Sequence, residues 1–164
     1  MRVIWLNGTV GSGKSAVGRA LAVRLPGARF LDGDDCAGPR QLPRGVRWRM
    51  ALERLLAACA KARAERTLVI AYPLDRSGWR RVRRVCGRAR RELLIITLAP
   101  PLGLTLRGRS GRRLSAAEQA RAREMRGEGY HRRRFAALTL PNACPPPSRT
   151  AMRVVRWLYS TNSR

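Results

Sequence analysis

The sequence predicts an α/β fold in which a five-stranded parallel sheet lies between two layers of helices. Short apolar runs alternate with amphipathic helical patterns along the 164 residues, as expected when parallel strands are joined by crossover helices. Each run is apolar at consecutive positions, which is typical of strands buried on both faces. Hydrophobic residues make up 45% of the chain, enough for a core, and the length suits one domain over residues 1–164.

Each predicted strand is an apolar run that ends at a turn signal. The first leads into a glycine-rich loop, the second leads into a cluster of aspartates, and Pro73 follows the third. The fourth ends before Pro100 and Pro101, and the fifth precedes the proline-rich loop 142–148. The predicted strands are Val3–Leu6, Arg29–Leu31, Thr67–Ala71, Leu93–Leu98 and Ala137–Leu140.

The segments between the strands show helical spacing of apolar residues. The first of these helices stops before Pro26 and Gly27, a pair that favours a turn. The predicted helices cover residues 15–25, 44–64, 76–91, 102–107, 115–135 and 149–159. Residues 108–114 are rich in glycine and arginine and are expected to form a loop.

The chain is strongly basic, with 35 Lys and Arg against 10 Asp and Glu and a formal net charge of +25. Only Lys14 and Lys61 are lysines, a bias compatible with genomic base composition, which does not explain the shortage of acids. A surplus of this size implies attraction to polyanions. Nucleic acid, phosphorylated metabolites and an acidic partner all remain open.

The cysteines do not predict a metal site. Cys36, Cys59, Cys86 and Cys144 form no C-x-x-C pair, and the only histidine, His131, is not at zinc-ligand spacing. Reduced thiols are expected instead. No apolar run approaches the ~20 residues of a membrane span, and the start has no signal-peptide pattern. We expect a soluble cytoplasmic protein.

Residues 8–15, GTVGSGKS, match the phosphate-loop pattern G-x-x-x-x-G-K-[ST] between a predicted strand and a predicted helix. Glycines let the loop curl so that its N–H groups and the helix N-terminus hold a polyphosphate. Lys14 would reach the terminal phosphates, and the Ser15 hydroxyl suits Mg²⁺. The alternative is an ordinary strand–helix turn. The predicted nucleotide-binding residues here are Gly8, Gly11, Ser12, Gly13, Lys14 and Ser15.

Residues 30–35, FLDGDD, follow the second predicted strand and so lie at the same edge of the sheet as the phosphate loop. Phosphoryl transfer needs a carboxylate near the metal and a group that orients the nucleophile. We assign Asp32 to the Mg²⁺ shell and Asp34 to the acceptor hydroxyl, with Asp35 pointing away. A solvated acidic turn is the alternative interpretation.

Together, GTVGSGKSAVGRALAVRL and FLDGDD resemble the small P-loop kinases of metabolites: the shikimate, gluconate and adenylylsulfate kinases and related antibiotic phosphotransferases. AYPLDRSGWRRVRR is similar to the segment after the third strand of the gluconate and adenylylsulfate kinases. GRRLSAAEQARAREMRGEGYHRRRFA resembles the shikimate kinase lid and the helix after it. The resemblance implies a P-loop NTPase fold of three α/β/α layers with a small lid at about 107–117, and ATP and Mg²⁺ as cofactors.

The same resemblance implies roles for several arginines. Arg112 corresponds to the lid arginine on ATP, and Arg126, four residues before Tyr130, to a substrate-side arginine. Arg49 falls where these kinases carry a substrate-binding arginine, and Arg80 belongs to the aromatic-Arg pair that opens a helix.

In such enzymes adenine lies between a lid-proximal arginine and the loop after the last strand. This implies Arg107 or Arg109, together with Asn142. Shikimate kinases carry a glycine triplet after the third strand, whereas this chain has AYPLD at 71–75, and CAGPRQ does not match the gluconate kinases. The resemblance therefore does not identify the acceptor.

Two arginine-rich segments have alternative interpretations. Arg107, Arg109, Arg112 and Arg113 flank a glycine-rich stretch, as in a mobile lid that brings cations onto phosphates, or in a basic surface loop. No acid interrupts the arginines of residues 76–91, which form either a solvated helix face or a surface for a polyanion.

The leading function is therefore a kinase that moves the γ-phosphate of ATP to a hydroxyl of a small molecule, such as a sugar acid, a nucleoside or an antibiotic. A second is a P-loop kinase whose acceptor hydroxyl lies on DNA or RNA. A third is a non-catalytic nucleotide-binding protein, which would not need Asp34.

Overall fold

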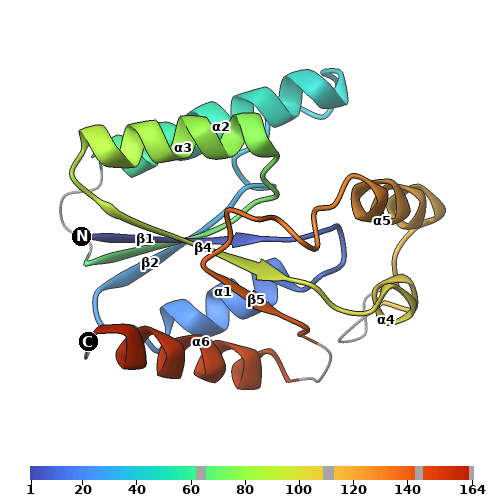
Figure 1. The fold of residues 1–164 in the computed structure, drawn as a ribbon. Helices are drawn as coiled ribbons and strands as arrows, with labels where there is room; N and C mark the ends of the chain where they lie inside the picture. Colours follow the sequence, from blue (N-terminus) through green and yellow to red (C-terminus); the bar gives the residue numbers. More distant parts are fainter. Residues whose placement is uncertain (62–65, 109–112, 143–145, 163–164) are drawn as a thin grey trace.

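The strands form one five-stranded parallel sheet, as predicted, and their order is β2-β3-β1-β4-β5 (Figure 1). The structure is a computed structural model and describes residues 1–61, 66–108, 113–142 and 146–162. The strands are β1 (Arg2–Asn7), β2 (Ala28–Asp32), β3 (Thr67–Ala71), β4 (Glu92–Leu98) and β5 (Leu138–Leu140).

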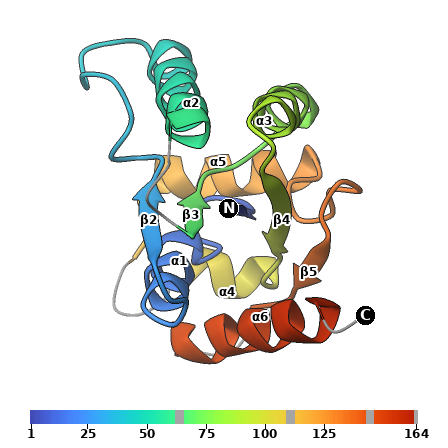
Figure 2. The ribbon, with the colours of Figure 1, turned by 90° about the vertical axis from the view of Figure 1, so that its left-hand side faces the viewer.

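Helices cover both faces of this sheet, which confirms the three-layer α/β/α architecture. Figure 2 shows α2 and α3 on one face, α1 and α6 on the other, and α4 and α5 beyond the ends of the strands. The helices are α1 (Lys14–Ala22), α2 (Arg44–Lys61), α3 (Arg76–Arg88), α4 (Leu102–Leu106), α5 (Ala116–Gly127) and α6 (Pro147–Asn162). None of the described helices is long and apolar enough to cross a bilayer.

The alternation of side chains along β1 divides the core into two parts. Val3 and Trp5 pack into the cluster under α2 and α3, whereas Ile4 and Leu6 pack into the cluster with α1 and α6. All four side chains are fully buried. This two-sided burial explains why the strand reads as a continuous apolar run.

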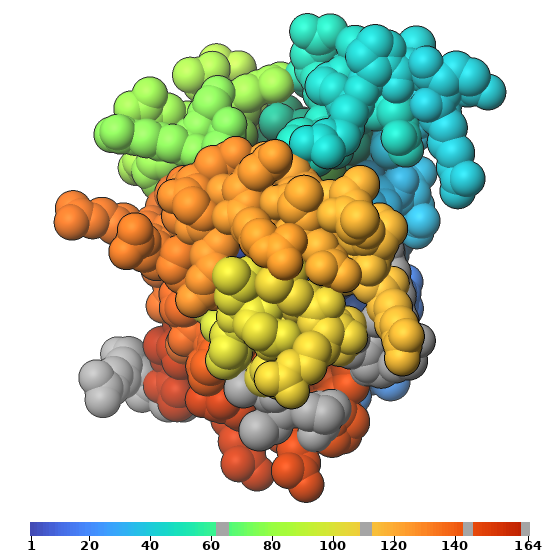
Figure 3. Space-filling view, turned by 90° about the vertical axis from the view of Figure 1, so that its right-hand side faces the viewer, coloured from blue at the N-terminus to red at the C-terminus, as the bar shows by residue number. Residues whose placement is uncertain are grey.

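Because all strands are parallel, their carboxyl ends lie at one edge of the sheet. Asp32 at the end of β2 pairs with Ala71 of β3, and Asn7 at the end of β1 pairs with Thr97 of β4. The phosphate loop and the aspartates therefore meet there. Figure 3 shows the molecule from this end, with α4 and α5 side by side and with α2 and α3 above them.

The helix predicted over 115–135 is too long. It ends at Gly127, because Gly129 adopts a φ of +78° and the Tyr130 N–H donates to the Met125 carbonyl at 3.0 Å. A left-handed glycine with this hydrogen bond is a common helix stop. The helix predicted over 76–91 likewise ends early, at Arg88.

The cysteines within the described residues are free thiols. Cys59 and Cys86 are buried between α2 and α3, and Cys36 is half-buried. Cys144 lies outside the described residues.

Candidate active site

The phosphate loop joins β1 to α1 and depends on glycine at three positions. Gly8, Gly11 and Gly13 have φ angles of 145°, 73° and 91°, which side chains other than glycine rarely adopt. A Cβ on Gly8 would also lie 2.5 Å from the Leu98 carbonyl oxygen. The loop conformation and the glycines of the GTVGSGKS motif therefore require each other.

Lys14 opens α1 and turns its amine back over the loop. Its Nζ donates to the carbonyl oxygens of Thr9, at 2.7 Å, and Gly8, at 3.2 Å. Burial lowers the pKa of Lys14 from 10.5 to about 8, and the charges of Asp34 and Asp32 oppose this shift. The amine thus lies where it could release these two carbonyl oxygens and donate to phosphate oxygens instead.

Asn142, just after β5, fastens the phosphate loop to α6. Its amide donates to the Ser12 carbonyl at 2.6 Å, and its Oδ1 accepts from the Thr150 hydroxyl at 2.6 Å. All three residues are buried, and Asn142 has a φ of +39°. We call the chain Ser12–Asn142–Thr150 the loop tether.

The aspartates sit in a tight turn directly after β2. The Asp34 N–H donates to Asp32 Oδ1 at 3.2 Å, and the Gly33 N–H donates to the Ala71 carbonyl at 3.0 Å. Gly33 packs closely against the Tyr72 ring, and a Cβ added to it would fall 2.0 Å from a ring carbon. The Tyr72 hydroxyl in turn donates to the Trp48 carbonyl of α2 at 2.9 Å.

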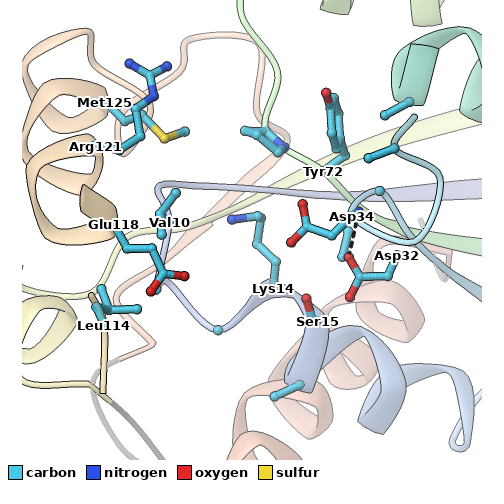
Figure 4. Close-up of a pocket in the computed structure, with 18 of the residues that line it drawn as sticks. Val10, Lys14, Ser15, Asp32, Asp34, Tyr72, Leu114, Glu118, Arg121 and Met125 are labelled. Carbon is cyan, nitrogen blue, oxygen red and sulfur yellow. Dashed lines mark hydrogen bonds between the residues drawn. The ribbon is translucent and has the colours of Figure 1, made fainter. Parts of the chain in front are cut away.

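The phosphate loop and the aspartate turn line one cavity of about 570 Å³. Figure 4 shows the Asp34 carboxylate pointing toward the Lys14 amine, and the Asp32 carboxylate near the Ser15 hydroxyl. Asp35 is exposed and does not line this cavity, as expected. The labelled lining residues are Val10, Lys14, Ser15, Asp32, Asp34, Tyr72, Leu114, Glu118, Arg121 and Met125.

Arginines from α2 and α5 line the far side of the cavity. The guanidinium groups of Arg44 and Arg121 lie 4.9 and 5.0 Å from the centre of the Trp48 ring, within cation–π distance. Arg121 also pairs with Glu124 at 3.0 Å and Glu128 at 2.9 Å. Arg121 is thus held by Trp48 on one side and by two glutamates on the other, at the lining of the cavity.

The other predicted arginines are not brought together at this cavity. Arg49 and Arg80 are exposed and do not line it, and neither does the exposed Arg107. Arg126 donates to the Pro100 carbonyl at 3.2 Å and joins α5 to the start of α4. The predicted residues Arg109 and Arg112 lie outside the described residues.

Sequence reasoning missed the arginines that do line the cavity, although a helical signal for them exists. Arg44, Arg47, Trp48 and Ala51 follow the i, i+3, i+4, i+7 spacing of one face of α2, and Arg49 falls off that face. On α5, Arg121 lies one turn before Met125 on the lining face.

No protein-family model matches this chain, and no curated protein matches its sequence. Solved structures do match it. A shikimate kinase from Acinetobacter baumannii in complex with shikimate superposes with a TM-score of 0.71 at 22% identity, over 100% of this chain and 96% of the other. The chain has the fold of the small P-loop kinases.

Two further structures support this likeness. An APS kinase from Mycobacterium tuberculosis, in complex with AMPPNP and APS, matches with a TM-score of 0.69 at 24% identity, covering 96% of this chain and 97% of that one. A gluconokinase from Sinorhizobium meliloti matches at 0.67 and 21%, covering 98% and 97%. The predicted resemblance to P-loop kinases is confirmed at the level of the fold.

Proposed function

We propose that this chain transfers the terminal phosphate of ATP to a hydroxyl group of a small molecule. The observation that carries the proposal is that Lys14, Ser15, Asp32 and Asp34 line one cavity. Its volume of about 570 Å³ lies within the range of small-molecule sites, roughly 300–1,000 Å³. A non-catalytic nucleotide-binding protein would not need Asp34 beside Lys14.

Ser15 and Asp32 fit a Mg²⁺ ion, because a hydroxyl and a carboxylate are hard oxygen donors. Among the described residues, no cluster of three or more His, Cys, Asp or Glu side chains would hold a metal. A site with one carboxylate is typical of Mg²⁺, which takes its other ligands from water and phosphates. When bound, Mg²⁺ neutralises charge that develops on the phosphoryl oxygens.

Residues of the chain itself carry out the other steps of the proposed reaction. The N–H groups of the phosphate loop and Lys14 hold the β- and γ-phosphates of ATP. Asp34 accepts the proton of the acceptor hydroxyl as the new O–P bond forms and the bond from the γ-phosphorus to the bridging oxygen breaks, which releases ADP. The guanidinium of Arg121 lies beside the acceptor.

In this proposal residues 107–117 form a lid on a single domain, and Arg112 contacts ATP. Gly108 and Leu114, on either side of the glycine-rich stretch, line the cavity. Arg107 or Arg109 would cover adenine. Asn142 would act on the nucleotide through the loop tether, because its amide is bonded to the Ser12 carbonyl.

The test is a screen of ATP consumption over hydroxylated metabolites, nucleosides and antibiotics, followed by the variant Asp34→Asn on the best acceptor. Loss of the general base should lower kcat by about 10²- to 10⁴-fold and leave ATP binding intact. Asp35→Asn is the matched control, because Asp35 is exposed and lies off the cavity.

Two results would count against the proposal. An Asp34→Asn protein with full transfer activity would remove the general base. ATP turnover that survives Lys14→Ala would show that the activity belongs elsewhere.

A further inference from the structure

Helix α3 carries a row of arginines along its outer side. Arg76, Arg80, Arg84 and Arg88 follow each other at intervals of four residues, and all four are exposed. Residues four apart are neighbours on a helix surface. We call these four residues the α3 ridge. Figure 1 shows α3 in the outer layer of the molecule, and the helix buries Gly78, Val82 and Cys86 on its other side.

The ridge is not neutralised by the rest of the described chain. No ion pair, hydrogen bond or cation–π contact joins its four side chains to another described residue. Arg81, one position off the ridge, does pair with Glu53 of α2. Like charges four apart on a helix destabilise it by about 0.2–0.5 kcal/mol per pair. The fold therefore tolerates a self-repelling row, which a polyanion would relieve.

The dimensions of the ridge match a long, regular polyanion. Twelve residues separate Arg76 from Arg88, which corresponds to about 18 Å along the helix axis. Duplex DNA carries one charge per about 1.7 Å of its axis with both strands counted, so a length of about 18 Å carries roughly ten phosphates, about five on each strand.

The surroundings of the ridge favour a duplex over a single strand. Single strands are usually bound by exposed aromatic rings on which bases stack. The aromatic residue of α3, Trp79, is only partly exposed and stacks on Phe135 with ring centres 5.1 Å apart. Arg83 covers Trp79 at 5.6 Å. The surface thus offers charge without a stacking platform.

We propose that the α3 ridge binds the phosphate backbone of double-stranded nucleic acid. Binding is independent of base sequence, because contacts to phosphates carry no sequence information. This activity goes beyond the proposed phosphotransfer and does not depend on it, since none of the four arginines lines the cavity.

The experiment measures binding of the full chain to a labelled 20-base-pair duplex between 50 and 200 mM KCl. Four phosphate contacts contribute a slope of about 3.6 to the fall of log K with log salt, or about 150-fold over this range. The ridge variant should lose that contribution. It combines Arg76→Gln, Arg80→Gln, Arg84→Gln and Arg88→Gln.

A matched control removes four exposed arginines elsewhere: Arg123→Gln, Arg134→Gln, Arg153→Gln and Arg156→Gln. Both variants lose the same charge, but the control leaves the α3 ridge intact. The control should therefore keep most of the affinity for the duplex and most of the salt slope. Thermal melting and ATP binding show whether each variant is folded. A milder variant, Arg80→Gln with Arg84→Gln, should lose about half of the ridge contribution, a slope of about 1.8.

Equal losses in the ridge variant and the control would overturn the proposal, because binding would then follow net charge alone. Tighter binding of polyglutamate than of the duplex would assign the ridge to an acidic protein instead. A Lys14→Ala protein should bind the duplex normally, so failure of this inference and failure of the proposed phosphotransfer are separate results.

Discussion

Lys14 carries a charge that the proposed binding of ATP needs, in a position that disfavours that charge. Burial lowers its pKa to about 8, below the 10.5 of a solvated lysine. The nearby carboxylates of Asp34 and Asp32 reduce this effect but do not reverse it. The free protein therefore begins to lose this charge at a pH where a fully solvated lysine side chain is still protonated.

We expect the affinity for ATP to fall above pH 8. The free protein must then take up a proton on Lys14 before the amine can pair with phosphate, which costs up to about 10-fold per pH unit. Calorimetric titration with ATP between pH 7 and 10 measures this. Lys14→Met removes the titrating group and should show weak binding without this slope. A flat profile for the unaltered protein would contradict the expectation.

Gly33 separates the two site aspartates and lies against the Tyr72 ring. Gly33→Ala would place a methyl group 2.0 Å from a ring carbon, so the turn or the ring must move. We expect a loss of about 1–3 kcal/mol in the free energy of unfolding, measured in urea, and slower transfer. Gly45→Ala is the control, because nothing lies within 4 Å of its added Cβ. Equal stability of the two variants would exclude this packing role.

Among the elements, the chain after β5 and the start of α6 contribute Asn142 and Pro147 to the cavity lining, and they also hold the phosphate loop through the loop tether. Asn142 leaves β5 in the left-handed region, where asparagine is better tolerated than most residues. Its amide satisfies both the Ser12 carbonyl and the Thr150 hydroxyl. The phosphate loop is thereby positioned from the opposite end of the sequence.

Breaking the tether should weaken ATP binding. Asn142→Gly keeps the backbone conformation but removes the amide, and Thr150→Val removes the hydroxyl. An unsatisfied buried group costs about 1–3 kcal/mol. Because the two residues share one chain of bonds, their effects on ATP affinity should be non-additive by about 0.5 kcal/mol or more in a double-mutant cycle. Strict additivity would mean that the two bonds act independently.

At the scale of the whole molecule, the net charge of +25 destabilises the compact state through self-repulsion. Salt screens exposed charges, so the melting temperature should rise between about 20 and 300 mM NaCl. Calorimetry at pH 7 measures the rise. The ridge variant has four fewer positive charges, so its melting temperature should rise less with salt. A melting temperature that falls with salt would mean that ion pairs outweigh repulsion.

The fold was predictable from the sequence because each buried strand is a continuous apolar run with a turn signal after it. The phosphate loop was predictable as a motif because its backbone conformation requires glycines, and the aspartates were predictable because they directly follow a predicted strand. The end of α5 was not predicted correctly, because it depends on Gly129 adopting a left-handed conformation.

The arginines of the cavity were harder to predict, because their role depends on how each helix is rotated against the sheet. Arg47 lines the cavity, whereas Arg49, two residues later, faces solvent. Arg126 fits the motif spacing but bonds to the Pro100 carbonyl, and Arg121 takes the position beside Trp48. Helical spacing separates Arg47 from Arg49, whereas the contacts of Arg121 and Arg126 depend on tertiary packing that a single sequence does not show.

The loop tether also orders events during synthesis. Ser12 and Asn142 are 130 positions apart, so a ribosome adding about 5–20 residues per second makes them about 7–26 s apart. Until Asn142 and Thr150 leave the exit tunnel, the phosphate loop has the right residues but lacks its anchor. The proposed nucleotide binding would then have to wait until Asn142 and Thr150 have been made.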